Sequence, residues 1–422
     1  IVTFNNQLIA MNADAKTYKF NGSSPQVILN QTQPGLKLKT NGTELIVTTA
    51  NHVFVLNQAF SQVANITSIP NFSAIFTAAT VVGTKLYIGT EKNGLFSTDL
   101  ANPTTFESMS PNGPVRNYIF RIKKAPNFLW AVYGDYTFDY NPFPLDEYGI
   151  SKYSTNTSWE TIPYENLFEA KSISGLAISP INTNLVYATS YYSGVLKINN
   201  EEIELFNNIN TGPDGLEPFT PQPWVLINSP AFDKNGNLWV TNRGTDKAIK
   251  VLRTTNQWQS YDIGDYITNG RFASMGIDRN DTKWLPTRDD GVIAFNDTRN
   301  NKTLRIDDSS GLPTTNVLCI AIDKRNQLWI GTAAGLRVLS SVDQFLQQDE
   351  LTVSNIVIQE GDLAQELFYQ QIITDIAVDG ANRKWVAIDN GGVFLVSGNG
   401  QQTLYQFDKN NSLKRYRGDV YY

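Results

Sequence analysis

The chain has 422 residues, a net charge of −6, 41% hydrophobic and 12% aromatic side chains, one cysteine and one histidine. This composition excludes disordered, collagen-like and disulfide-stapled proteins, and at about 150 residues per domain the length allows two or three domains. One histidine and one cysteine cannot form a structural zinc site, and the sequence has neither a basic block for nucleic acid nor an apolar run of about 18 residues for a membrane-spanning helix.

From the N-terminus, short segments rich in β-branched and aromatic residues alternate with turn residues, a pattern typical of β-strands. They lie at 8–10, 45–49, 86–90, 129–132 and 185–189. We expect each to be the strand core of one repeat. The single histidine, His52, occupies a turn position where the next copy has Gly94. We therefore interpret it as a turn residue and not as a catalytic base.

An aromatic, proline-containing insertion at 133–148 interrupts these repeats. Trp130 and Tyr187 are 57 positions apart, where the later repeats are about 45 long. Loops on a rigid scaffold often carry function, and aromatic side chains can stack on sugar rings or anchor a protein partner. The alternative is a loop folded over its own hydrophobic cluster. The candidate partner or glycan surface consists of Tyr133, Tyr136, Phe138, Tyr140, Phe143 and Tyr148.

The C-terminal half contains four copies of one spacing, an aspartate six positions before a tryptophan. The pairs are Asp233 and Trp239, Asp278 and Trp284, Asp323 and Trp329, and Asp379 and Trp385. Successive tryptophans (239, 284, 329 and 385) are 45, 45 and 56 positions apart, a period typical of propeller blades. We expect these tryptophans to occupy equivalent sheet positions and to pack one blade against the next.

Within one copy the pattern is strand, tight turn, strand. The segment 317–322 precedes the turn at 323–327, and 328–332 follows it. A glycine-marked turn, a third strand and a more polar fourth strand complete the unit, the last exemplified by 402–407. Helical periodicity is convincing only at 341–351.

Together with the weaker copies, the sequence contains about nine repeat cores, more than the four to eight blades usual around one axis. It therefore predicts an all-β protein, a β-propeller built from four-stranded blades and divided into two propellers. The proline-rich stretch 207–223 marks the expected boundary, with a first, partial propeller over 1–210 and a second over 211–422. Two seven-bladed rings would need about 14 copies, so we expect some blades to be absent from this sequence.

Few residues suggest chemistry. The acidic turns at 233–237 and 278–281 resemble calcium loops but lack the sixth-position glycine and distal glutamate, so we favour aspartates that cap their own hairpins. We interpret Asp289 and Asp290 as a solvated hairpin tip, although they could form an acidic pair. Cys319 lies within an apolar strand, where we expect it to be buried and unreactive. We therefore assign no catalytic residue, metal ion or cofactor.

The segment 311–336 reads GLPTTNVLCIAIDKRNQLWIGTAAGL. It resembles the two-component-regulator propeller repeat, which has a GL-containing turn, a strand ending in aspartate and an LWIGT strand followed by a second GL. This resemblance implies a propeller fold and a bacterial extracytoplasmic setting, but a fold does not define a function.

Other segments carry a more specific resemblance: ITDIAVDGANRKW at 373–385, GGVFLVS at 391–397, YNPF at 140–143 and EYG at 147–149. They resemble the PorZ family, the propeller proteins of the type IX secretion system in Bacteroidetes. The resemblance implies a non-enzymatic platform on the outer-membrane exterior or in the periplasm. It also implies a sortase-like partner, PorU, together with PorV and PorQ, and the binding of anionic lipopolysaccharide.

Two alternatives remain at the level of sequence. The chain could be the glycan-sensing ectodomain of a hybrid two-component regulator, in which case a membrane-spanning segment and a kinase would follow in the gene. It could also be an enzyme, either a propeller polysaccharide lyase or a glycosidase. Activity on anionic polysaccharides would distinguish the enzyme from the two binding functions.

Overall fold

A computed structural model describes residues 1–22, 24–70, 72–109, 112–360 and 363–407. The chain divides into two compact units, Ile1–Asn112 and Gly113–Tyr422. In the described residues, short antiparallel strands dominate both units, as the alternating sequence pattern predicts. Each unit is described by itself.

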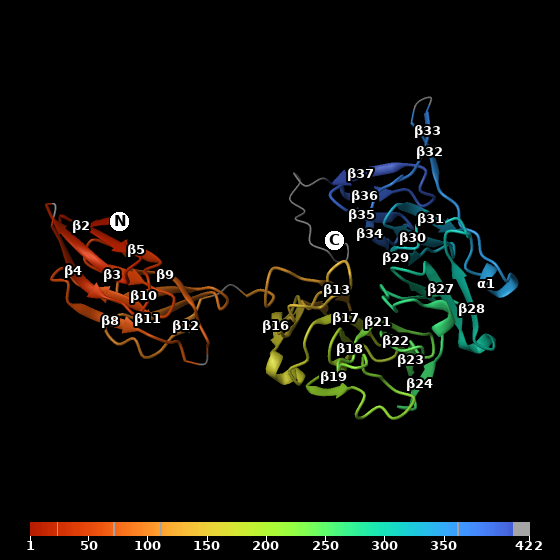
Figure 1. The fold of residues 1–422 in the computed structure, drawn as a ribbon, viewed down its shortest axis with the longest axis horizontal. Coiled ribbons are helices and arrows are strands. Elements are labelled where there is room, and N and C mark those ends of the chain that lie inside the picture. Colours follow the sequence, from red (N-terminus) through yellow and green to blue (C-terminus); the bar gives the residue numbers. More distant parts are fainter. Residues whose placement is uncertain (23, 71, 110–111, 361–362, 408–422) are drawn as a thin grey trace. The chain divides into compact units, whose positions relative to one another are not determined.

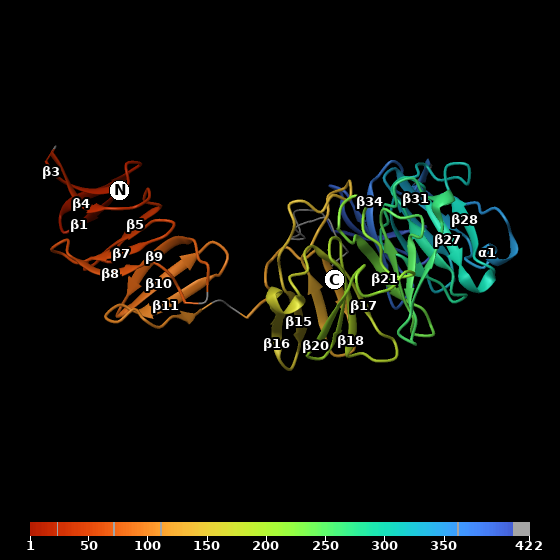
Figure 2. The ribbon, with the colours of Figure 1, turned by 60° about the horizontal axis from the view of Figure 1, so that its bottom comes forward.

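The described residues of the first unit form three four-stranded antiparallel sheets, which follow one another in chain order (Figure 2). Buried side chains lie between neighbouring sheets, such as Phe4 and Leu45 between the first two, and Ile46 and Phe76 between the second and third. The strands are β1 (Val2–Phe4), β2 (Gln7–Asn12), β3 (Lys16–Asn21), β4 (Ser24–Asn30), β5 (Lys37–Thr40), β6 (Leu45–Thr48), β7 (Val53–Leu56), β8 (Gln62–Ile66), β9 (Phe76–Val82), β10 (Lys85–Thr90), β11 (Leu95–Asp99) and β12 (Glu107–Ser108).

Among its described residues, the second unit contains six larger sheets arranged around a common centre (Figure 1) and one two-stranded sheet. We call the larger sheets blades 1 to 6. Blade 1 has β13 (Arg121–Lys124), β14 (Leu129–Val132), β15 (Ile150–Ser154) and β16 (Ser158–Ile162); blade 2 has β17 (Ile173–Ile178), β18 (Leu185–Ser190), β19 (Gly194–Asn199) and β20 (Glu202–Phe206); blade 3 has β21 (Ile227–Phe232), β22 (Leu238–Asn242), β23 (Ile249–Leu252) and β24 (Trp258–Tyr261).

Blade 4 has β25 (Gly276–Ile277), β26 (Lys283–Pro286), β27 (Val292–Asn296) and β28 (Lys302–Ile306); blade 5 has β29 (Val317–Ile322), β30 (Leu328–Thr332) and β31 (Gly335–Leu339); blade 6 has β34 (Ile373–Val378), β35 (Lys384–Ile388), β36 (Gly392–Val396) and β37 (Thr403–Phe407). The helices in the described part of the chain are short: three 3-10 turns, η1 (Tyr164–Leu167), η2 (Gly264–Tyr266) and η3 (Asp297–Arg299), and one α-helix, α1 (Gln344–Gln347). Helix α1 lies within the predicted helical segment 341–351.

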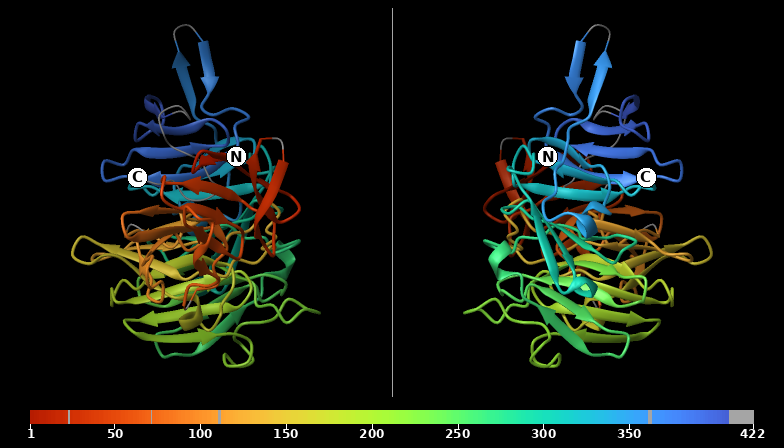
Figure 3. Two further views of the ribbon diagram at one scale, coloured as in Figure 1. Left: turned by 90° about the vertical axis from the view of Figure 1, so that its left-hand side faces the viewer. Right: turned by 90° about the vertical axis from the view of Figure 1, so that its right-hand side faces the viewer.

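Blade 5 has three named strands, and a two-stranded hairpin follows it. In place of a fourth strand, Ser354 forms an isolated bridge to Val338. The hairpin strands β32 (Val357–Glu360) and β33 (Leu363–Glu366) project from the body of the second unit (Figure 3).

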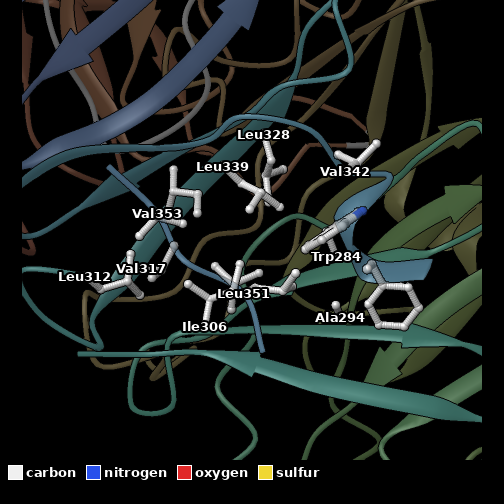
Figure 4. Packing of buried hydrophobic residues seen from close by; sticks show 13 residues of the cluster. Trp284, Ala294, Ile306, Leu312, Val317, Leu328, Leu339, Val342, Leu351 and Val353 are labelled. Atoms are coloured by element: carbon white, nitrogen blue, oxygen red, sulfur yellow. The ribbon is translucent and has the colours of Figure 1, made fainter. Parts of the chain in front are cut away.

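The hydrophobic core of the second unit is divided into separate clusters between successive blades. Blades 4 and 5, for example, enclose Trp284, Val317, Leu328 and Leu339 (Figure 4). Equivalent clusters lie between blades 1 and 2, 2 and 3, 3 and 4, and 5 and 6. Blades 2 to 5 are therefore buried on both faces, as radial stacking requires.

The four patterned tryptophans occupy equivalent positions, which confirms the repeat prediction. Each lies in the second strand of its blade, in β22, β26, β30 and β35. Each is also paired in register with a small residue of the first strand, Ala231, Gly276, Ala321 or Ala377. Trp239, Trp284 and Trp329 are fully buried, whereas Trp385, in the last blade, is half-buried.

The nine predicted repeat cores correspond to the nine larger sheets of the described residues, three in the first unit and six in the second. The division between the units, at 112/113, does not coincide with the predicted boundary at 207–223. That stretch connects β20 to β21, and Leu216 packs into the core between blades 2 and 3. This proline-rich stretch is therefore an ordered connection between adjacent blades and not a linker between domains.

Candidate functional site

The strands of the second unit end in different kinds of connection on its two sides. In every four-stranded blade of the second unit, the turns between first and second strands and between third and fourth strands lie at one end, which we call the turn face. The turns between second and third strands and the connections between blades lie at the other end, the loop face. The insertion 133–148 connects β14 to β15 and therefore belongs to the loop face.

The repeat aspartates of the turn face stabilise the hairpins in which they stand. Each accepts, at Oδ1, the backbone N–H groups two and four residues further on, at 2.8–3.0 Å. The other carboxylate oxygen of Asp233 and of Asp278 accepts the indole N–H of the patterned tryptophan at 2.9 and 3.0 Å. The predicted hairpin capping is confirmed. No group of three or more possible metal ligands was found in the described residues.

A channel of about 600 Å³ runs along the inner strands of the second unit. Its walls come from all six blades, through the first strand of each or the residues beside it. The lining carries both signs of charge, with Arg121 and Lys123 on blade 1 and Asp375 on blade 6, together with hydroxyl groups such as that of Ser229. The channel is therefore a largely apolar cavity that also carries charged groups of both signs.

The insertion 133–148 closes the channel at the loop face instead of projecting from it. Tyr136, Thr137, Phe138 and Tyr140 all line the channel. Tyr136 stacks on Tyr140 with ring centroids 4.8 Å apart, and both contact Tyr191 of the neighbouring blade. This part of the insertion acts as a plug, because its rings pack inward on one another.

Side chains from the opposite blades hold the plug in place. Arg243 of blade 3 donates to the carbonyl oxygen of Tyr140 at 2.7 Å, and Arg288 of blade 4 donates to that of Phe138. Arg288 also forms an ion pair with Asp139 at 2.6 Å. Asn228 donates to the Tyr136 hydroxyl at 3.0 Å. A loop that leaves blade 1 is thus fixed across the mouth of the channel.

Burial raises the pKa of two phenols at this place, that of Tyr140 in the plug and that of Tyr191, which packs against the plug from blade 2. Desolvation raises the pKa of Tyr191 to about 12, although the Arg243 guanidinium acts in the opposite direction. Desolvation also raises the pKa of Tyr140 well above its ordinary value. Both phenols are therefore neutral hydrogen-bonding groups at physiological pH and poor candidates for proton abstraction.

The remaining predicted aromatic residues have different positions. Tyr133 is buried and donates to the Ser151 hydroxyl at 2.5 Å. Tyr148 is half-buried, with the Arg116 guanidinium 4.3 Å from its ring centroid. Phe143 remains 43% exposed. Of the six candidates, Phe143 therefore offers the most accessible ring, and a binding role for the whole set stays a prediction.

Phe143 belongs to a surface cluster whose other two members, Tyr192 and Trp224, were not predicted from the sequence. Its ring centroid lies 5.2 Å from that of Trp224 and 6.2 Å from that of Tyr192, and the latter two are 5.6 Å apart. We call these three residues the aromatic shelf. The sequence contained one indication of this cluster. Trp224 directly follows the proline-rich stretch 207–223 and has no aspartate six positions before it.

A second cavity, of about 680 Å³, lies where the loop face of blade 1 meets that of blade 6. It is lined by Arg116, Tyr133 and Asp146 from around blade 1, and by Asp389 and Asn390 from blade 6. Desolvation raises the pKa of Asp146, while a backbone N–H and the Arg116 guanidinium 3.4 Å away oppose that rise. Arg116 thus keeps a partly buried carboxylate paired.

His52 and Cys319, which the sequence analysis also considered, contact neighbouring parts of the fold. His52 lies in the turn between β6 and β7, stacks on Phe54 and shares a hydrogen bond with Asn65. Cys319 is buried in β29, as expected.

The interpretation of Asp289 and Asp290 as a solvated tip is wrong. Asp289 forms a bidentate ion pair with Arg271, at 2.7 and 2.8 Å. Asp290 is buried and accepts the backbone N–H and the hydroxyl of Thr268. Both carboxylates tie a turn of blade 4 to the connection between blades 3 and 4.

The sheets, the channel and the plug define a β-propeller protein. The family model for the two component regulator propeller matches residues 311–334, which span the end of the blade 4 to 5 connection and the first two strands of blade 5. No curated protein sequence matches the chain.

Among solved structures, the chain is similar to PorZ of Porphyromonas gingivalis, described as an essential bacterial surface component of the type-IX secretion system. The two share 19% identity with a TM-score of 0.83, over 97% of this chain and 57% of the PorZ chain. The extracellular domain of the hybrid two component system BT3049 from B. thetaiotaomicron shares 17% identity, over 98% of this chain and 58% of its own, with a TM-score of 0.35. The likeness to PorZ establishes the propeller fold.

Proposed function

We propose that this chain is a non-enzymatic β-propeller platform of the type IX secretion attachment complex at the bacterial cell surface. In this function it binds a sortase-like partner of the PorU kind, acts with PorV and PorQ counterparts, and contacts anionic lipopolysaccharide. The observation that carries the proposal is the PorZ fold, which extends over 97% of the chain. Because the chain spans 57% of the PorZ chain, the activity of the whole protein remains part of the proposal.

The geometry of the loop face supports a binding role. Desolvation raises the pKa values of Tyr140 in the plug and of Tyr191, which packs against it, and the acidic residues Asp146 and Asp289 are paired with arginines. Such a site holds its groups fixed and neutralised, whereas acid–base catalysis needs a proton-transferring group with a pKa near the working pH. The hydrogen-bonded loop and the exposed ring of Phe143 suit recognition.

The setting of the proposal is extracytoplasmic, at the outer-membrane exterior or in the periplasm of a member of the Bacteroidetes. PorZ is itself described as a surface component, which supports this setting. Within the described ranges, none of the helices has the length and apolar character needed to cross a bilayer.

Deletion of the gene in its source bacterium tests the proposal. We expect secreted cargo to keep its C-terminal signal uncleaved, and the wild-type gene to restore cleavage. Normal cargo processing in the deletion strain would contradict the platform function. Purified protein should also leave a panel of anionic polysaccharides unchanged, and release of unsaturated or reducing ends would contradict the non-enzymatic assignment.

A second candidate is the glycan-sensing ectodomain of a hybrid two-component regulator. The match of 311–334 to the two component regulator propeller favours it. Reading the complete gene separates the two candidates, because a regulator requires a membrane-spanning segment and a kinase downstream of the propeller. A gene without them would eliminate the sensor.

A further inference from the structure

The aromatic shelf is built from three loops that meet at the loop face. Phe143 comes from the insertion, Tyr192 from the turn between β18 and β19, and Trp224 from the connection between blades 2 and 3. Phe143 is 43% exposed, and the other two rings are half-buried. None of the three belongs to a hydrophobic core cluster among the described residues. Packing of the core therefore does not explain why three aromatic residues gather here.

The shelf is fixed by backbone hydrogen bonds. The N–H of Val225 donates to the carbonyl of Tyr192 at 2.9 Å, and Ser193 and Val225 form a parallel bridge, so Trp224 is held beside Tyr192. On the other side, the N–H of Phe219 donates to the carbonyl of Trp224 at 2.7 Å. A ligand would meet rings that are already in place, which lowers the entropic cost of binding.

Polar groups border the shelf. The Lys171 ammonium forms an ion pair with Glu147 at 2.6 Å, and both side chains remain accessible, with exposures of 34% and 52%. The backbone N–H of Lys171 donates to the hydroxyl of Ser193, the residue after Tyr192, at 3.1 Å, which places Lys171 beside the shelf. The Glu147 carboxylate is the main cause of the raised pKa of Lys171, and the Tyr192 phenol also contributes. Donors and acceptors are thus available at the edge of an apolar surface.

We propose that the aromatic shelf is a glycan-binding subsite, on which the apolar face of a sugar ring stacks while its hydroxyl groups bond to Lys171 and Glu147. The proposal deepens the proposed function and rests on its glycan-binding part. A sugar ring needs both an apolar plane and polar groups around its rim, and the shelf supplies both.

The size of the shelf favours a sugar over a protein partner. An aromatic ring buries roughly 150–250 Å² when fully covered, and these rings are already partly covered. A stable protein interface takes about 800 Å² from each partner. Three half-covered rings fall well short of that area, whereas one or two sugar units match it.

The indole N–H signals of the protein provide a direct test. The chain has eight tryptophans, and Trp224→Phe assigns the signal of Trp224 in ¹H–¹⁵N spectra. The probe is the polysaccharide released from lipopolysaccharide by mild acid, separated into neutral and anionic fractions. We expect at least one fraction to shift the Trp224 signal, while the signals of the buried Trp239 and Trp284 stay in place.

Affinity measurements on variants complete the test. We expect Trp224→Ala to weaken polysaccharide binding at least tenfold and Tyr192→Ala at least threefold. The matched control is Tyr369→Ala, which removes a 60% exposed ring elsewhere in the second unit and should leave binding unchanged. Unaltered signals of Trp239 and Trp284 in each variant show that the fold is intact.

Three results would overturn the subsite: no shift of the Trp224 signal with either fraction, equal affinity in Trp224→Ala, or a shift of that signal by the sortase-like partner alone. If polysaccharide binds and moves other signals, the shelf is rejected while the platform function stands. If the shelf binds sugar but the deletion strain processes cargo normally, the platform function fails and the subsite stands.

Discussion

The ion pair between Lys384 and Asp323 links blade 6 to blade 5 at a point where water is excluded. Both side chains have 0% exposure, and Lys384 Nζ lies 2.8 Å from Asp323 Oδ2. The same ammonium donates to the carbonyl oxygens of Asn382 and Gly398, at 3.0 and 2.6 Å, and stands 4.4 Å from the centroid of Trp329. Lys384→Met would remove the charge and keep most of the side-chain volume.

The size of the effect follows from what the substitution leaves behind. Breaking a buried ion pair by removing one partner costs about 3–5 kcal/mol, because the other charge stays buried without compensation. Asp323 would retain the backbone N–H groups of Arg325 and Gln327 and the Asn382 amide. We therefore expect a loss of about 3 kcal/mol in the free energy of unfolding, near the lower end of that range.

Urea unfolding monitored by tryptophan fluorescence measures this loss. All eight tryptophans lie beyond residue 112, so the signal reports on the second unit alone. The control is Lys247→Met, which breaks the exposed pair between Lys247 and Asp214 and should have little effect. Adding Asp323→Asn to Lys384→Met should recover about half of the loss, because the neutral amide can still accept the turn N–H groups. A cost below about 1 kcal/mol would refute the reasoning.

Three further predictions concern the second unit. Gly291→Ala should lower the free energy of unfolding by about 2–4 kcal/mol, because a Cβ at its φ of +75° would lie 2.0 Å from the carbonyl oxygen of Ile306. The control is Gly212→Ala, at φ +74° with open space around it, which should lower the free energy of unfolding clearly less in the same urea titration. The double variant Arg243→Met and Arg288→Met should speed proteolytic cleavage within 133–148, as read by mass spectrometry, and an unchanged rate would show that the arginines do not hold the plug. Burial alone would raise the pKa of Asp323, but the hydrogen bonds from Lys384 and from the turn bring it below its ordinary 3.8. The stabilisation that the ionised Asp323 carboxylate gives to the folded state should therefore be complete above pH 3.8 and be lost as pH falls below it. Acid unfolding of Lys384→Met should be less steep below pH 3.8, and identical curves would disprove the linkage.

The fold was predictable because its determinants are local and repeated. An aspartate six residues before a tryptophan encodes a capped hairpin and places the ring in the second strand, as Asp278 and Trp284 show. The third copy departs from this rule, because Lys384 of the next blade takes Asp323 Oδ2 and Trp329 Nε1 has no hydrogen-bond partner within the described residues. The replacement of the indole donor by Lys384 depends on contact between two blades, which the spacing within one repeat cannot predict.

The candidate site was harder to predict because it depends on contacts far apart in sequence. The aromatic content of 133–148 indicated a special loop, but its burial depends on Arg243 and Arg288, which lie 103 and 150 positions beyond the residues they hold. The aromatic shelf likewise joins Phe143 to Trp224, which no repeat pattern connects. A single sequence gives the residue types of such a site but not their partners.

The two faces of the second unit differ in their tolerance of insertions for a physical reason. At the turn face, one carboxylate such as that of Asp323 accepts several hydrogen bonds at fixed positions, so a change in turn length would break the cap and the contact with the next blade. At the loop face, the connection between second and third strands ranges from two residues, 333–334 in blade 5, to the long segment 133–149 in blade 1. Insertions there leave the ladder hydrogen bonds intact. Binding groups can therefore accumulate on the loop face without loss of the blade, which is where the plug and the aromatic shelf are found.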